Sequence, residues 1–242
     1  MRPLSRLAAM HLVAVSALAI FPATSPAQER APVAKEIGKA YGVDSFGQVV
    51  AIRYTFNIPE FKLSRTWVWE PKTDTVSHEG KDKQGNPVKV TYKRGDLDSQ
   101  SDDVKKNIDP AFVNDQYVLL FPLHVAWDTW ATVTDEGMHE MPLSKKSARR
   151  VVVKYPGEGG YSPGDTWELY VGKNKRIEEW VYHRNGTEFP KLYTATYEGY
   201  KKAGPLLLST DHEGNGDGKP LRVFFSDVAL KVTGSDNWIN AE

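Results

Sequence analysis

Hydrophobic residues first recur at helical spacing in the segment from Pro32 to Tyr41. Val33, Ile37 and Tyr41 lie four positions apart, so they fall on one side of a predicted short helix. Gly42 follows at once. It is expected to end the helix, because glycine tolerates the left-handed backbone with which many helices close.

The period then changes to two, which is typical of strands with one buried face. After Gln48, the apolar residues Ile52, Tyr54 and Phe56 alternate with more polar neighbours up to Pro59. Similar runs follow, separated by turn-forming glycine and proline residues. Further strands are therefore predicted at Ser64–Glu70, Thr73–Glu79, Val88–Lys93, Arg149–Tyr155, Thr166–Val171, Arg176–His183, Leu192–Tyr200, Pro205–Thr210 and Leu221–Val232.

One longer apolar segment in the middle of the chain predicts a second helix. Asp109 is suited to the N-cap and Pro110 to the first helical position, and Val113 and Tyr117 then share a face. Pro122 is expected to end or kink this helix. Antiparallel strands on both sides of two helices predict a single, mostly β domain.

Several predicted strands are apolar on both faces. Trp67 points opposite to Val68, and Trp180 opposite to Val181. Such a sheet requires two apolar covers. Either part of one face stays open as a cavity for acyl chains, or helices and loops fill the concave face as ordinary core. The candidate ligand-lining residues are Trp67, Trp69, Phe121, Trp127, Trp130, Trp167, Trp180 and Tyr182.

The N-terminal segment has the layout of a secretory signal peptide. Arg2 and Arg6 precede an apolar run from Leu7 to Phe21, and small residues lead to a predicted cleavage site before Gln28. The run is too short for a bilayer of about 30 Å, which favours cleavage over an uncleaved anchor. Residues 28–242 are then expected to form one domain in the periplasm or outside the cell.

Composition narrows the classes of function. The chain has no cysteine, so neither a disulfide framework nor an acylated N-terminal cysteine is available. Loss of the first 27 residues, which hold two arginines and no acid, changes the net charge from zero to −2. A nucleic-acid partner is not expected, because binding phosphates requires a basic face.

Four stretches carry a resemblance to a known fold family: Tyr117–Pro122, Trp127–Asp128, Gly159–Asp165 and Arg222–Val228. With the order of the predicted elements, they resemble secreted bacterial proteins related to the LolA and LolB lipoprotein carriers. The resemblance implies a half-open antiparallel β-barrel with a helical lid around a hydrophobic cavity. It also implies an arginine that latches the lid, which the sequence pattern does not single out. The missing cysteine excludes a LolB-like anchored receptor.

Metal and catalytic motifs are weak. Asp211–Gly218 begins like a calcium loop, but position twelve is Arg222, so a structural hairpin is the favoured interpretation. The histidines lack zinc-binding spacing. His124 and Asp128 would meet if the helix resumed after Pro122, either to orient a base or simply to staple the helix end.

No catalytic motif is found, and neither a cofactor nor a metal is expected. We therefore expect a non-enzymatic protein that binds a hydrophobic or lipid-like ligand in a concave sheet, and a transient protein partner in the cell envelope is compatible with that role. Two alternatives remain at this point. One is a module that binds carbohydrate or envelope polymer through stacking tryptophans, and the other is a hydrolase with an unrecognised site.

Overall fold

The computed structural model describes residues 31–81, 85–158, 163–185 and 191–242. The predicted signal peptide and its cleavage site lie outside these ranges. Two α-helices, α1 (Pro32–Ala40) and α2 (Asp109–Trp127), accompany short 3₁₀ and π turns at Val43–Gln48, Pro59–Phe61, Arg94–Ser99 and Val104–Ile108. The strands are β1 (Val49–Ile58), β2 (Leu63–Glu70), β3 (Thr75–Lys81), β4 (Pro87–Lys93), β5 (Thr132–Glu140), β6 (Ser147–Lys154), β7 (Thr166–Val171), β8 (Ile177–His183), β9 (Leu192–Thr196), β10 (Glu198–Ala203), β11 (Leu206–Gly216), β12 (Lys219–Val232) and β13 (Ile239–Asn240).

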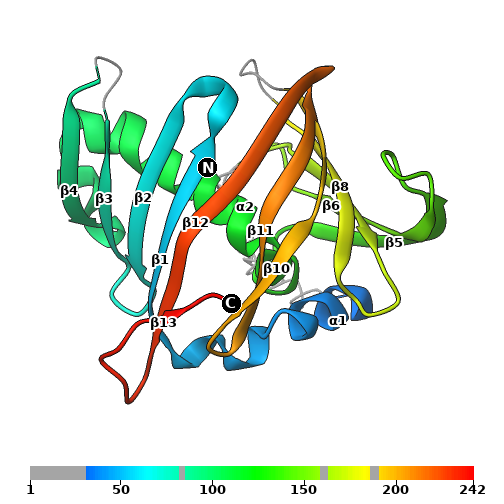
Figure 1. Cartoon of the computed structure of the whole chain (residues 1–242), viewed down its shortest axis with the longest axis horizontal. Helices are drawn as coiled ribbons and strands as arrows, with labels where there is room; N and C mark the ends of the chain where they lie inside the picture. Colours follow the sequence, from blue (N-terminus) through cyan, green and yellow to red (C-terminus); the bar gives the residue numbers. More distant parts are fainter. Residues whose placement is uncertain (1–30, 82–84, 159–162, 186–190) are drawn as a thin grey trace, which may run out of the picture.

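The strands form one open antiparallel sheet. Its order is β4-β3-β2-β1-β12-β11-β9-β8-β7-β6-β5, with β10 added to β11 and β13 added to β12. Strands β4 and β5 are the two edges, and the sheet curves around α2, which runs behind it in Figure 1. The expected fold class, a half-open antiparallel barrel with helices, is confirmed.

Helix α1 forms as its spacing predicts. Val33, Ile37 and Tyr41 are each at most 4 % exposed, and Gly42 follows in the left-handed conformation with φ 91°. The helix packs on α2 at Gly38, where a Cβ atom would lie 2.5 Å from the Cβ of Ala126. Glycine is needed here because the two helices approach so closely.

Helix α2 differs from its prediction at both ends. A π turn at Val104–Ile108 leads directly into it, so Asp109 has helical backbone angles and is not the N-cap. Pro122 lies inside the helix, which continues to Trp127. Proline removes one hydrogen-bond donor, but the burial of thirteen of the nineteen residues of this helix outweighs that loss.

The opposite face of the sheet has a smaller apolar cluster of its own. Met141, Ala148, Tyr170 and Val181 pack together there. The buried carboxylate of Glu179 accepts hydrogen bonds from the backbone N–H groups of two residues in the covering loop, at 2.7 and 2.8 Å. The expectation that strands such as β8 need two covers is therefore met. Among the described residues, no helix combines the length and apolar character needed to cross a membrane.

Candidate functional site

The concave face of the sheet carries a continuous layer of aromatic rings beneath α2. Phe121 of α2 stacks on Trp167 at a centroid distance of 3.8 Å, and Trp167 stacks on Trp180 at 4.8 Å. The layer extends through His212, whose ring lies 5.7 Å from Trp180, to Phe225 at 6.1 Å. These residues come from α2, β7, β8, β11 and β12, so the curved sheet gathers them from across the chain.

Most of the predicted lining residues are part of this interior. Trp67, Phe121, Trp167 and Trp180 are each at most 3 % exposed. Trp69, Trp127 and Tyr182 are partly buried and pack against the same core. Trp130 is 52 % exposed in the turn after α2 and does not join them. Whether these side chains contact a ligand stays a prediction, because here they contact one another and α2.

Three buried carboxylates of α2 and its C-terminal end fasten the helix to the sheet. The first is Asp115, which accepts hydrogen bonds from Arg65 Nη2 at 2.6 Å and Trp67 Nε1 at 2.9 Å. Burial raises the pKa of Asp115 to about 6, against the opposing effect of the Arg65 charge. The free-energy cost of removing this carboxylate from water therefore exceeds the stabilisation that its charged and hydrogen-bonding partners provide.

The second carboxylate is Asp109, near the start of α2. Its Oδ1 accepts hydrogen bonds from the Tyr92 hydroxyl at 2.9 Å and from Arg94 Nε at 2.8 Å. These two donors come from β4 and from the turn that follows it, so the start of α2 is tied to the edge of the sheet.

The third carboxylate is Asp128, just beyond the last residue of α2. Its Oδ2 accepts hydrogen bonds from Tyr117 at 2.9 Å and Tyr155 at 2.8 Å, and His124 Nδ1 lies 3.1 Å from Oδ1. The predicted meeting of His124 and Asp128 is confirmed. The other ring nitrogen, Nε2, contacts Gln116 Oε1 at 3.1 Å. With both nitrogens engaged, this imidazole fits a structural staple better than a base.

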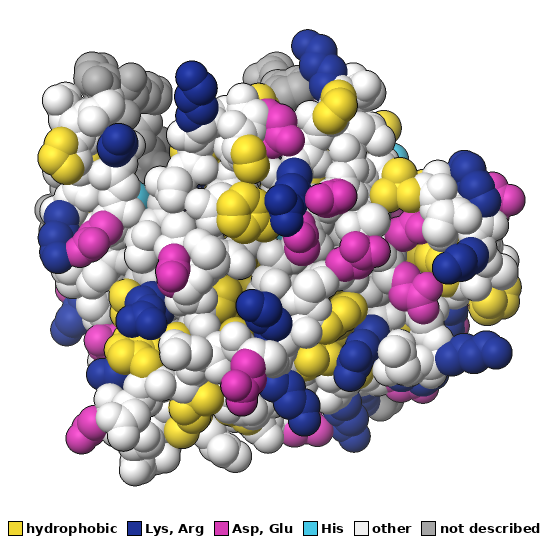
Figure 2. Space-filling view, in the orientation of Figure 1, with side chains coloured by type: hydrophobic (Ala, Val, Ile, Leu, Met, Phe, Trp, Pro, Cys, Tyr) yellow, Lys and Arg dark blue, Asp and Glu magenta, His cyan; other side chains and the backbone are white. Residues whose placement is uncertain are grey.

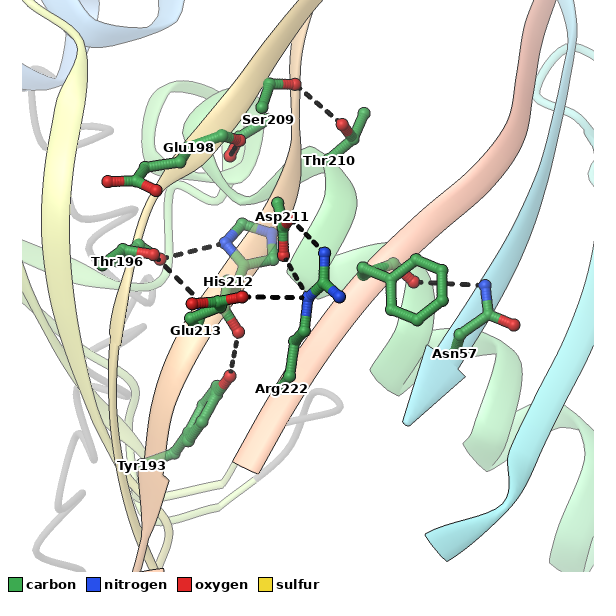
Figure 3. A network of polar contacts seen from close by, with 12 residues as sticks. Asn57, Tyr193, Thr196, Glu198, Ser209, Thr210, Asp211, His212, Glu213 and Arg222 are labelled. Atoms are coloured by element: carbon green, nitrogen blue, oxygen red, sulfur yellow. Dashed lines mark hydrogen bonds and ion pairs between the residues drawn. The ribbon is translucent and has the colours of Figure 1, made fainter. Parts of the chain in front are cut away.

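Several buried polar atoms lack a hydrogen-bond partner, and three of them belong to side chains in or against the aromatic layer. They are Tyr54 Oη, His212 Nε2 and Trp167 Nε1. Burial lowers the pKa of His212 to about 4, so its ring is neutral near pH 7. Its Nδ1 lies 3.2 Å from the Thr196 carbonyl oxygen and donates to it, which leaves Nε2 as an acceptor (Figure 3). Such unsatisfied atoms are uncommon in protein interiors.

Sequence reasoning missed Asp115, Arg65, Tyr54 and His212 as members of this site. One signal was available for the first two. Arg65 shares the inward phase of Trp67 in β2, and Asp115 interrupts an apolar helix, so each is a charge at a core position. Their pairing spans 50 residues of sequence, and only the folded chain brings them together.

Residues 211–218, which begin like a calcium loop, form part of a β-hairpin, as the favoured interpretation predicted. Gly216 pairs with Lys219 across the turn, and the Asp211 carboxylate accepts Arg222 Nε at 2.8 Å and Nη2 at 2.5 Å (Figure 3). The Asp217 carboxylate accepts hydrogen bonds from the backbone N–H groups of Lys191, just before β9, at 3.0 Å and of Leu192, its first residue, at 2.8 Å. Within the described ranges, no three metal-ligating side chains are grouped as an ion would require.

Comparison with known proteins adds little. No protein-family model and no curated protein sequence matches this chain. A solved structure of a DUF1329 family protein from Desulfovibrio piger is similar at a TM-score of 0.41 and 10 % sequence identity. The match covers 85 % of this chain and 95 % of that one.

Proposed function

We propose that this protein binds an amphiphile, an apolar chain with a hydrogen-bonding group, on the concave face that α2 now covers. The single observation that carries the proposal is the set of orphaned polar atoms of Tyr54, His212 and Trp167 within an aromatic layer. Tyr54 Oη and Trp167 Nε1 offer donors, and His212 Nε2 offers an acceptor. Aromatic rings would bury the apolar chain, at about 25 cal/mol per Å² before binding costs.

Entry of the ligand requires α2 to move away from the aromatic layer. The helix is held by apolar packing on the sheet and by hydrogen bonds of three carboxylates, and not by backbone pairing with the strands. One of the three, Asp115, is buried at a net electrostatic cost. We infer that α2 acts as a displaceable lid. The LolA resemblance implies an arginine latch between sheet and lid, and Arg65 makes a contact of that kind.

The setting we propose is the periplasm or the exterior of the cell, where such a protein would carry its ligand between partners in the envelope. The signal-peptide pattern at residues 1–27 supports this setting. A glycan-binding module would need tryptophans exposed as stacking platforms. The burial of Trp67, Trp167 and Trp180 does not suit that role.

The test combines native mass spectrometry with titration of a fluorescent fatty acid. Protein secreted to the periplasm is expected to carry a bound amphiphile or to take up the probe. Tyr54→Phe removes an unpartnered hydroxyl, so we expect unchanged stability but about three- to tenfold weaker binding of the probe. Trp130→Phe, at the exposed tryptophan, is the matched control and should bind normally. Protein that is always ligand-free and ignores the probe would refute the proposal.

A further inference from the structure

A second candidate site lies on the face of the sheet opposite α2. Strands β11 and β12 pair between residues 211–216 of β11 and residues 219–224 of β12, while the first half of β11 pairs with β10 instead. The first half of β11 and the second half of β12 therefore diverge, and they leave a cleft of about 370 Å³ between them. Its lining residues are Arg53, Lys201, Thr210, Phe225, Ser226, Asp227, Val228, Asn240 and Ala241.

Arg53 supplies a positive charge to this cleft. Its neighbours Ile52 and Tyr54 are fully buried on the concave side, so the alternation of β1 directs Arg53 to the other face. The guanidinium packs over the ring of Trp238 at 4.8 Å, and its Nε is buried without a partner. Arg53 forms no ion pair with any described residue, whereas Arg222 on the same face is paired with Asp211.

The strand opposite Arg53 is distorted at the cleft. The register passes from Arg53↔Ala229 to Thr55↔Ser226, so β12 has one extra residue there. Asp227 within this bulge has φ 53°, a conformation that residues other than glycine rarely adopt. Bulges and strained residues occur often beside binding sites, where they redirect side chains.

The cleft therefore combines groups that suit an anion with groups that suit hydroxyls. Arg53 and Lys201 provide two positive charges and Asp227 one negative charge, so the lining has a net charge of +1. The Asp227 carboxylate accepts a hydrogen bond from Ser226 Oγ at 3.1 Å and retains capacity for other donors. The ring of Trp238 holds the guanidinium in place, which lowers the entropy cost of binding.

We propose that this cleft binds a small hydroxylated ligand bearing a carboxylate or phosphate, such as a sugar acid or a sugar phosphate. Arg53 would donate to the anionic oxygens with the planar geometry that guanidinium offers. Lys201 would supply the second charge, and Asp227 would accept ligand hydroxyls. Charged side chains of both signs are mixed over this face in Figure 2, so the specificity lies in the cleft and not in a broad basic surface.

Calorimetric titration with glucuronate, glucose 6-phosphate and uncharged glucose tests this site. At least one of the two anions should bind and glucose should not, and the stronger anion identifies the head group. Arg53→Gln should weaken that binding about tenfold or more. Because Arg53→Gln also alters the packing of Trp238, the exposed Lys201→Gln serves as a second variant with the same expected direction.

Arg222→Gln is the control, since it removes an arginine of the same face that lies outside the cleft. It should bind like the unaltered protein, and thermal unfolding of every variant shows whether the fold is retained. The proposal is overturned if neither anion binds at millimolar concentration, if glucose binds equally well, or if folded Arg53→Gln and Lys201→Gln both bind like the unaltered protein.

Discussion

Replacement of Asp115 by asparagine should change the stability of this protein in a pH-dependent way. The carboxylate is fully buried beside Arg65, and burial raises its pKa from 3.8 to about 6. Because the folded state binds this proton more tightly, the contribution of Asp115 to stability is complete below about pH 3.8. It is lost as the pH rises through about 6. The difference of about 2 pKa units corresponds to about 3 kcal/mol.

The Asp115→Asn variant lacks this titration. Relative to the unaltered protein, it should therefore gain up to about 3 kcal/mol of unfolding free energy between about pH 4 and about pH 7. Urea unfolding followed by tryptophan fluorescence at several pH values measures the difference. Comparing the two proteins at each pH removes the contribution of all other titrating groups.

Asp211→Asn provides a control of opposite sign. The pKa of Asp211 is lowered, mainly by the hydrogen bond from Arg222. The contribution of the Asp211 carboxylate to the stability of the protein is therefore lost as the pH falls. No relative gain is expected for that variant as the pH rises toward neutrality. If Asp115→Asn instead loses stability relative to the unaltered protein over the same range, the ion pair with Arg65 outweighs desolvation and the reasoning about the α2 latch is wrong.

Two further predictions concern packing, and thermal or urea unfolding checks both. Gly38→Ala should destabilise the protein by about 1–3 kcal/mol, because the new methyl group would overlap Ala126, whereas Gly47→Ala should change stability by less than about 0.5 kcal/mol since nothing lies near it. A neutral Gly38→Ala would contradict the close contact of α1 and α2. Trp180→Ala should cost about 3–5 kcal/mol and Trp130→Ala little, given their exposures of 1 % and 52 %; equal losses would contradict the placement of the aromatic layer.

The elements with one regular apolar period were predicted well from sequence. Helix α1 and strand β7 match their predicted ranges to within one residue, because their buried positions recur at a single spacing. Strand β5 was missed. It is exposed along nearly its whole length and has no apolar face, so its strand conformation depends on pairing with β6.

Errors at other boundaries have the same origin. The predicted strand Leu192–Tyr200 is divided into β9 and β10, which pair with different parts of β11. Strand β11 continues through the polar residues 211–216 because β12 supplies hydrogen-bond partners there. In both cases, distant backbone groups decide a conformation that local residue preferences leave undetermined.

The sequence by itself determined the β-rich class of this chain, the two helices, the absence of disulfides and the surplus of aromatic residues on several strands. Each of these features follows from the residue types and their local spacing along the chain. The tertiary structure decided that α2 covers the aromatic layer, that Asp115 meets Arg65, and that Arg53, which has no acidic partner among the described residues, lies beside a bulge. These are relations between strands far apart in the chain, and the curvature and register that create them arise only when the whole sheet is assembled.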